Sequence, residues 1–248
     1  MAVSTTLNLV VTWFGRRKKR VEVPRLRSRS DPAANVNRVA LGELTPALIP
    51  FLGQAAYLQL SIYERLAHAI AMAPTMEAKE ALSRVASVSL AKHHGLVAEI
   101  ERKGGKAAAA MAPCMERIDY YRSITQGDDW FELVTACYLA AGILDDFYLS
   151  LSTGLPEDSA RRIAEVFSTE SGDEVLAHEL QMAIEANPRL ASRLAVWGRR
   201  LVGDTLLIAR SALAMPPATA KDEEQLEPVV TEVIAAHTRR MDAIGLTA

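Results

Sequence analysis

Apolar residues recur at helical spacing in four long stretches of the chain, and the strand-forming residues show no alternating runs. The first stretch follows Thr45-Pro46, where an N-cap residue precedes a proline suited to the first helical turn. Its apolar positions from Leu48 to Ile70 lie three or four residues apart, as on one face of an amphipathic helix. The pattern therefore predicts a first long helix that ends at about Ala73.

A second long helix is predicted directly after the first, with only a short turn between them. Pro74-Thr75 interrupts the first helix, and a new apolar pattern runs from Leu82 to Ile100 before Gly104-Gly105. So short a connection brings the two helices together as an antiparallel hairpin. Residues 106–127 are then expected to form a long crossover that contains a short stretch of Met and Ala residues.

The second half of the chain is predicted to contain two more long helices, separated by an insertion. Asp129 with Glu132 three residues later forms a capping box for a helix that runs to about Thr153. Asn187-Pro188 begins the fourth long helix, which stops before two consecutive prolines. Further helices are predicted over Ser159–Phe167, Asp173–Ala186 and Glu223–Ile244.

These elements predict an all-α protein, an antiparallel four-helix bundle with a long crossover, inserted short helices and a C-terminal helix. Half of the 248 residues are hydrophobic, which is enough for one substantial core. The predicted division of the chain is a basic arm at residues 1–36, the bundle at 37–215 and a C-terminal helical extension at 216–248.

Charge is concentrated at the N-terminus. Residues 1–36 contain eight basic and two acidic side chains, a net charge of +6, and since the whole chain has −2 the remainder has −8. We expect this arm to be disordered and to contact RNA or another anionic surface by counterion release. The alternative interpretation is a solvated tail without a binding role, because runs of charge are common and this one lacks interleaved aromatic residues.

The sequence also indicates a cytoplasmic location. In the apolar run Leu7 to Phe14 the basic cluster follows the run rather than preceding it, which argues against a secretory signal. No uninterrupted apolar run approaches the roughly 20 residues of a membrane span. Two widely separated cysteines, Cys114 and Cys137, have no metal-ligand spacing and are typical of a reducing compartment.

The centre of the predicted bundle holds few metal ligands. By helical rise, Gln59 and Leu90 both lie about 21 to 23 Å from the turn at Pro74, and His93 is the only imidazole clearly placed at that level. A di-iron bundle takes carboxylates from all four helices and a Glu-x-x-His step from two of them. An amide and a leucine are poor substitutes for those carboxylates, so the spacing argues against two bound irons.

Three aspartates in the other half of the bundle remain candidate ligands. Asp145 and Asp146 lie among apolar residues of the third helix, and Asp204 lies inside the fourth, where a carboxylate is costly unless it is paired or coordinating. Ion pairs offer an explanation without metal, between Arg200 and Asp204 on one helix and between Arg199 and Asp146 across an interface. Glu132 is expected to serve its capping box rather than a metal.

Four motifs stand at the ends or centres of the predicted helices: Ala73-Pro74-Thr75, Asp129-Trp130-Phe131-Glu132, the run from Gly142 to Tyr148, and Trp197-Gly198-Arg199-Arg200-Leu201-Val202-Gly203-Asp204. With them, residues from about 53 to 213 resemble the ferritin-like superfamily. More closely, they resemble its actinobacterial branch, similar to the tRNA hydroxylase that acts on 2-methylthio-N6-isopentenyladenosine. The resemblance implies a four-helix bundle and, in active members, a di-iron site that activates oxygen.

Carried over position by position, the resemblance implies glutamate at four sites, where this chain has Gln59, Leu90, Ser150 and Asp204, whereas His93 and Asp146 match the pattern. A degenerate di-iron site is therefore predicted. A single metal ion could still be held by His93, Asp146 and Asp204 together with water. No cofactor is expected, apart from iron in the case that the site functions.

The leading hypothesis is a ferritin-like protein related to tRNA hydroxylases with a degenerate di-iron site and a non-catalytic structural or interaction role. Its partner would be a paralogous ferritin-like protein or a second copy of the chain. The alternative is a working metal-dependent monooxygenase that hydroxylates a modified nucleoside in tRNA, with the basic arm holding the RNA.

Overall fold

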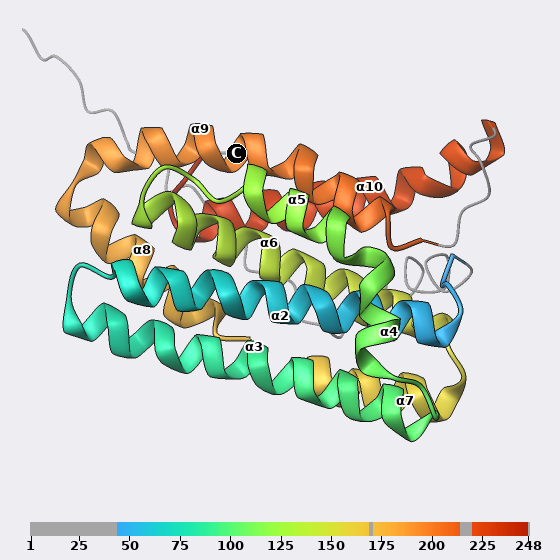
Figure 1. Ribbon diagram of the computed structural model, residues 1–248. Helices are drawn as coiled ribbons and strands as arrows, with labels where there is room; N and C mark the ends of the chain where they lie inside the picture. The colour runs from blue at the N-terminus through green and yellow to red at the C-terminus, as the bar shows by residue number, and fades with distance from the viewer. Residues whose placement is uncertain (1–43, 169–170, 214–219, 248) are drawn as a thin grey trace, which may run out of the picture.

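The computed structural model describes residues 44–168, 171–213 and 220–247 of the chain, and within these residues every regular element is a helix. The predicted all-α fold is confirmed. Four long helices lie side by side along one direction (Figure 1). They are α2 (Leu48–Met72), α3 (Met76–Arg102), α6 (Trp130–Leu151) and α9 (Pro188–Arg210).

The hairpin of α2 and α3 forms as predicted, and its turn is held by a side-chain cap. The Thr75 hydroxyl accepts a hydrogen bond from the backbone N–H of Ala78 at 3.1 Å, which satisfies one free donor at the start of α3. The start of α2 differs from the prediction, because the helix begins at Leu48 and Thr45 does not cap it. The Thr45 hydroxyl instead donates to the carbonyl of Leu151 at 2.5 Å, joining the start of α2 to the end of α6.

The crossover between the two halves of the bundle is more helical than its composition suggested. It contains α4 (Ala107–Met111), a 3-10 turn at Ala112–Cys114 and α5 (Met115–Ile124). A Cβ atom at Gly53 would overlap the backbone carbonyl of Ala110, so α4 can lie directly on α2 only because residue 53 is glycine. The crossover is therefore a packed layer across α2 rather than a loop.

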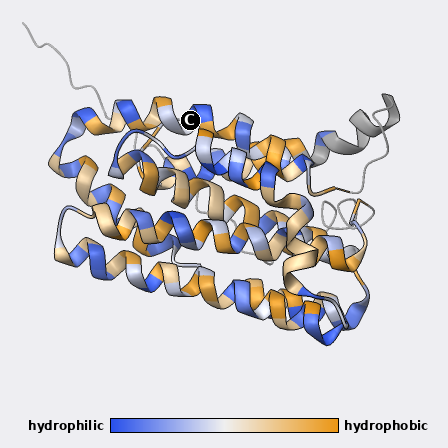
Figure 2. Ribbon diagram, viewed as in Figure 1, coloured by the Kyte–Doolittle hydropathy of each residue, from blue (hydrophilic) through white to orange (hydrophobic). Residues whose placement is uncertain are grey.

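Helix α6 is the central helix of the fold. Most of its residues are buried, and in Figure 2 it carries mostly neutral and hydrophobic colours along its length. By length and composition the segment Trp130–Gly154, which includes α6 and a 3-10 turn at Ser152–Gly154, could cross a membrane, but 78% of its apolar window is buried inside the fold. Its hydrophobicity is thus that of a core helix packed on several sides.

Two shorter helices follow α6, close to their predicted ranges, and lie between the two halves of the bundle. Helix α7 (Glu157–Phe167) packs against α3, and α8 (Asp173–Ala186) packs against α3, α6 and α9. The close approach of α8 to α3 needs Gly172, whose φ of 75° is a left-handed conformation that other residues rarely adopt.

The last helix, α10 (Ala220–Ala243), forms near its predicted range and packs against α6 and α9. Its Arg240 lies against Gly142 of α6, at a point where a Cβ atom would overlap the guanidinium group. The same guanidinium forms ion pairs with Asp173 of α8 at 2.5 Å and with Asp146 of α6 at 3.3 Å. Arg240 therefore fastens α10 to two other helices.

Candidate functional site

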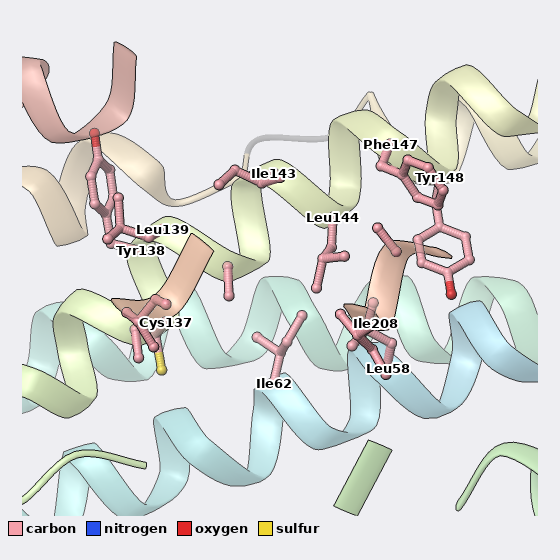
Figure 3. Close-up of a cluster of buried hydrophobic side chains, with 14 of the residues drawn as sticks. Leu58, Ile62, Cys137, Tyr138, Leu139, Ile143, Leu144, Phe147, Tyr148 and Ile208 are labelled. Atoms are coloured by element: carbon pink, nitrogen blue, oxygen red, sulfur yellow. The ribbon is translucent and has the colours of Figure 1, made fainter. Parts of the chain in front are cut away.

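The interior of the bundle between α2, α6 and α9 is filled by apolar side chains. Figure 3 shows Ile62 of α2 and Leu144 of α6 pointing toward each other, with Leu58 of α2 and Ile208 of α9 beside them. All four side chains are buried. Aliphatic groups cannot bind a metal ion, so this part of the bundle supplies packing energy and no ligands.

One polar group in the interior is a triad from three different helices. The amide of Gln59 (α2) donates to Oδ1 of Asp145 (α6) at 2.6 Å, and the ammonium of Lys92 (α3) donates to Oδ2 at 2.5 Å. The exposed fractions of these residues are only 1%, 8% and 3%, respectively. Both carboxylate oxygens of Asp145 are thus occupied by donors from the protein itself.

The triad is an ion pair in an apolar surrounding. Burial raises the pKa of Asp145, while the Lys92 ammonium and the Gln59 amide oppose that rise by stabilising the carboxylate. The Lys92 charge is therefore what allows a carboxylate to remain in the core. A buried pair of this kind fixes the relative positions of the helices that carry it more surely than it stabilises the fold.

Asp146, the first residue predicted to bind metal, points away from the triad, toward the surface of α6. Its side chain is 50% exposed and pairs with Arg240 of α10. One residue along a helix turns the side chain by about 100°, which places Asp145 inward and Asp146 outward. The predicted ion pair between Asp146 and Arg199 does not form, because the Arg199 guanidinium donates to the Thr247 carbonyl at 2.7 Å.

His93, the second residue predicted to bind metal, is buried between α2 and α3. Its Nδ1 lies 2.9 Å from the backbone carbonyl of Ala56, and since a carbonyl only accepts, Nδ1 is the protonated nitrogen. That hydrogen bond fixes the ring and directs Nε2 away from α2. Its neighbour His94 is exposed, as its position one residue further along the helix predicted.

Asp204, the third predicted ligand, is half-buried on α9 beside Thr205. Thr205 is buried and shares a hydrogen bond of 3.2 Å with the hydroxyl of Tyr121 from α5. The predicted ion pair between Arg200 and Asp204 is absent from the described residues, where the Arg200 guanidinium lies over the Trp197 ring at 5.6 Å. The Arg200 side chain is thus directed toward Trp197, one turn before it on the helix, rather than toward Asp204, one turn after it.

Within the described ranges, no three His, Cys, Asp or Glu side chains gather closely enough to hold a metal ion. His93, Asp146 and Asp204 are thus not brought together, and Leu90 and Ser150 are half-buried without taking part in the triad. A di-iron centre needs several carboxylates and two histidines around a shared position. The donor set present, one carboxylate already bound to an ammonium and an amide, does not fit that group.

Two functional charges in the core were missed by the sequence reasoning. Lys92 continues the buried face through Ser89 and Leu96, and Arg65 continues the face through Leu58 and Ile62. The Arg65 guanidinium donates to the Thr125 hydroxyl at 3.0 Å and to its carbonyl at 2.5 Å. A basic residue at a position that helical spacing assigns to the core was the signal that could have revealed both.

Glu132 has the structural duty that the sequence predicted. Asp129 Oδ1 accepts from the Glu132 backbone N–H at 3.0 Å, and the Glu132 carboxylate accepts from the backbone N–H of Asp128 at 2.9 Å. The box is shifted by one residue from its usual form, in which the glutamate would reach the N-cap residue itself. Arg193 of α9 pairs with Asp129 at 2.5 Å, joining the start of α6 to α9.

Comparison with known proteins agrees with this architecture. A family model described as a ferritin-like domain of actinomycetes matches residues 44–217, well over half of the chain. The match spans α2 to α9, so it includes the residues of the triad and leaves out α10. No curated protein matches the sequence. With its helical bundle and this match, the chain belongs to the ferritin-like domain family of actinomycetes.

Proposed function

We propose that this protein is related to the tRNA hydroxylases but carries a degenerate di-iron site, and that its role is structural or interactive rather than catalytic. The observation that carries the proposal is the buried triad of Gln59, Lys92 and Asp145. A lysine ammonium cannot ligate a cation, and its charge repels one. Its position against the central carboxylate therefore opposes metal binding at that carboxylate.

Elemental analysis tests the proposal directly. The full chain, purified from cells grown with added iron, is expected to contain less than about 0.1 metal ion per chain, against roughly two for a di-iron bundle. The matched variant is Asp145→Asn, which removes the central carboxylate. A metal content near two in the natural chain that falls in this variant would refute the proposal.

The alternative function, a metal-dependent monooxygenase acting on a modified nucleoside in tRNA, has one supporting observation. A histidine that ligates a metal usually donates its other ring N–H to a carbonyl, as His93 does to Ala56. In this alternative the chain would hold a di-iron centre, with His93 as one of its ligands. His93→Gln should then abolish a stoichiometric metal content, whereas the exposed His94→Gln should leave it unchanged.

The cytoplasm is the proposed location, supported by two buried cysteines that remain free thiols. The basic arm at residues 1–36 lies outside the described residues, and RNA contact through it remains a proposal. For the interaction role, the proposed partner is a ferritin-like protein, either a paralogue or a second copy.

A further inference from the structure

The exposed face of α9 differs in charge from the rest of the protein. The helix contains five arginines, no lysine and one acidic residue, Asp204. All five arginines are exposed; they are Arg189, Arg193, Arg199, Arg200 and Arg210. Among the described side chains of the neighbouring α10, Glu227, Glu232 and Asp242 are acidic and exposed, whereas Arg239 and Arg240 already form ion pairs. The exposed face of α9 is therefore basic, and exposed carboxylates lie on the helix beside it.

Most of the arginine charge on α9 is not neutralised. Arg193 pairs with Asp129, but among the described residues none of the other four arginines has a carboxylate within 4.0 Å. Five arginines on other helices, Arg84, Arg102, Arg122, Arg161 and Arg162, form ion pairs, although the exposed Arg117 of α5 forms none among the described residues. The contacts of Arg199 with a carbonyl and of Arg200 with a ring leave their charges uncompensated.

Two large apolar side chains lie on the same face of α9. Val196 is 62% exposed and Leu207 is 67% exposed. They lie on one helix face with Arg200 and Gly203, where a Cβ atom would have no neighbour within 4 Å. Arginine and apolar residues without lysine are the composition of a protein–protein interface rather than of a surface left to solvent.

The complementary surface lies on α10 of the same molecule. Val230 and Ile234 are exposed apolar residues, and the exposed Glu227 is one turn before Val230. Figure 1 shows α9 and α10 running antiparallel, and a Cβ at Gly198 of α9 would contact Met241 of α10. By helical rise from that contact, Arg210 lies about 18 Å along α9 and Glu227 about 21 Å along α10 in the same direction. The two charges are therefore at similar levels.

We propose that α9 and α10 form the interface of a two-fold symmetric dimer with a second copy of this chain. A two-fold axis between two adjacent antiparallel helices places each α9 on the α10 of the other copy. This pairing sets Arg210 against Glu227, and Leu207 against the exposed apolar residues Val230 and Ile234. A second copy of the chain is then the partner for the proposed interaction role, and in this respect the dimer rests on the proposed function. The two can be tested separately, since molecular mass tests the dimer and metal content tests the degenerate site.

Sedimentation velocity of the full chain over a range of concentrations tests the dimer. A concentration-dependent dimer is expected, weaker in about 0.5 M than in about 0.05 M NaCl because exposed charges are screened. Leu207→Glu should raise the dimer Kd at least about tenfold. The matched control is Met76→Glu, an equally drastic change at an exposed apolar side chain of α3, which should leave the Kd unchanged.

A charge exchange tests the pairing itself. Arg210→Glu and Glu227→Arg should each weaken the homodimer, because each variant sets like charges against each other in both halves of the interface. An equal mixture of the two variants should form a heterodimer about as tight as the natural dimer, since both halves then regain opposite charges. Circular dichroism verifies that each variant remains folded.

A monomer at every concentration would overturn the proposal, and so would a dimer that Leu207→Glu leaves intact. Binding of total tRNA that Arg210→Glu abolishes, in a chain that stays monomeric, would instead make this face a nucleic-acid surface and also overturn the dimer.

Discussion

Asp145 and Asp146 are adjacent in the sequence but have opposite environments. Asp145 is buried and bound by Lys92 and Gln59, whereas Asp146 is half exposed and pairs with Arg240. The sequence could not decide between them, because α6 is buried on nearly all sides and apolar neighbours flank both positions. The choice is made by Lys92, a residue 53 positions earlier in the chain.

Removal of the Lys92 charge should be strongly destabilising. Lys92→Met leaves the Asp145 carboxylate in the core without its cation, and we expect the free energy of unfolding to fall by about 3–5 kcal/mol in urea denaturation. The double variant Lys92→Met with Asp145→Leu should regain most of this loss, because no buried charge then lacks a partner. Lys79→Met, at a half-exposed lysine of α3, is the control and should change stability little. Equal stabilities for the single and double variants would show that the pair is not coupled.

His237 predicts how stability depends on pH. Its ring is buried on α10, and this burial lowers its pKa below 6.5, an effect that the backbone of Gly198 only partly opposes. Below about pH 6.5 the unfolded chain therefore binds a proton that the folded chain does not, so the histidine's contribution to stability is present above this pH and is lost as the pH falls.

In His237→Leu, the free energy of unfolding should decrease less steeply between about pH 7 and pH 5 than in the natural chain. Urea denaturation at several pH values measures the two slopes, and His178→Leu on the exposed face of α8 is the control. Identical slopes for His237→Leu and the natural chain would contradict the assignment of the buried neutral state.

At the scale of elements, the attachment of α10 depends on a glycine of α6. Gly142 provides the space in which the guanidinium of Arg240 reaches Asp173 and Asp146. Burial disfavours the Arg240 charge, but the two carboxylates more than offset this effect and raise the pKa of Arg240. Helix α10, which lies outside the family match, is thus attached to the bundle by ion pairs with two of its other helices.

Gly142→Ala should loosen α10 while leaving the four long helices folded. The new methyl group overlaps the guanidinium of Arg240, so the ion pairs must shift, and amide hydrogen exchange in α10 should accelerate. Gly203→Ala on α9 is the matched control, because its methyl group meets no atom within 4 Å. That control should stabilise the helix by up to about 1 kcal/mol. Unchanged exchange in α10 after Gly142→Ala would show that Arg240 does not hold the helix.

Helix positions were predictable where a local signal marks them. The capping box at Asp129 predicted the start of α6, because a side chain within three residues satisfies the free backbone donor, and the break at Pro74-Thr75 marked the start of α3. Thr45 carried the same signal but bonds to Leu151, more than a hundred residues away. The helices of the crossover were missed for a related reason. Helix α4 is stabilised by packing on α2 at Gly53, and not by a pattern of apolar residues within the crossover itself.

At the scale of the whole molecule, the fold was more predictable than the site. The bundle is predicted from apolar residues that recur at helical spacing. Because many residues contribute to this pattern, a wrong interpretation of one residue does not change the predicted fold. The site depends on which few side chains meet, and the sequence analysis did not identify Lys92 and Arg65, although both are buried. The helical spacing of α2 and α3 marks both positions as core, but their partners Asp145 and Thr125 belong to other segments, which the sequence of one helix does not reveal.

The uneven charge of the chain leads to a prediction for the arm. Deletion of residues 1–36 removes a net charge of +6, and we expect helicity and melting temperature to remain nearly unchanged, because the described core begins at residue 44. Binding to RNA, measured at several salt concentrations, should become weaker and less salt-dependent. An unaltered salt slope would show that the arm does not contact the nucleic acid.

The lysine at the centre of the bundle has a consequence for how the protein folds in the cell. A core built around a bound ion matures only after that ion has been delivered, and it can be emptied again by a chelator. Here the positive charge is attached to the polypeptide at Lys92 and arrives with synthesis. On the proposed function, we expect newly made protein to reach its final shape equally well in iron-starved and iron-replete cells.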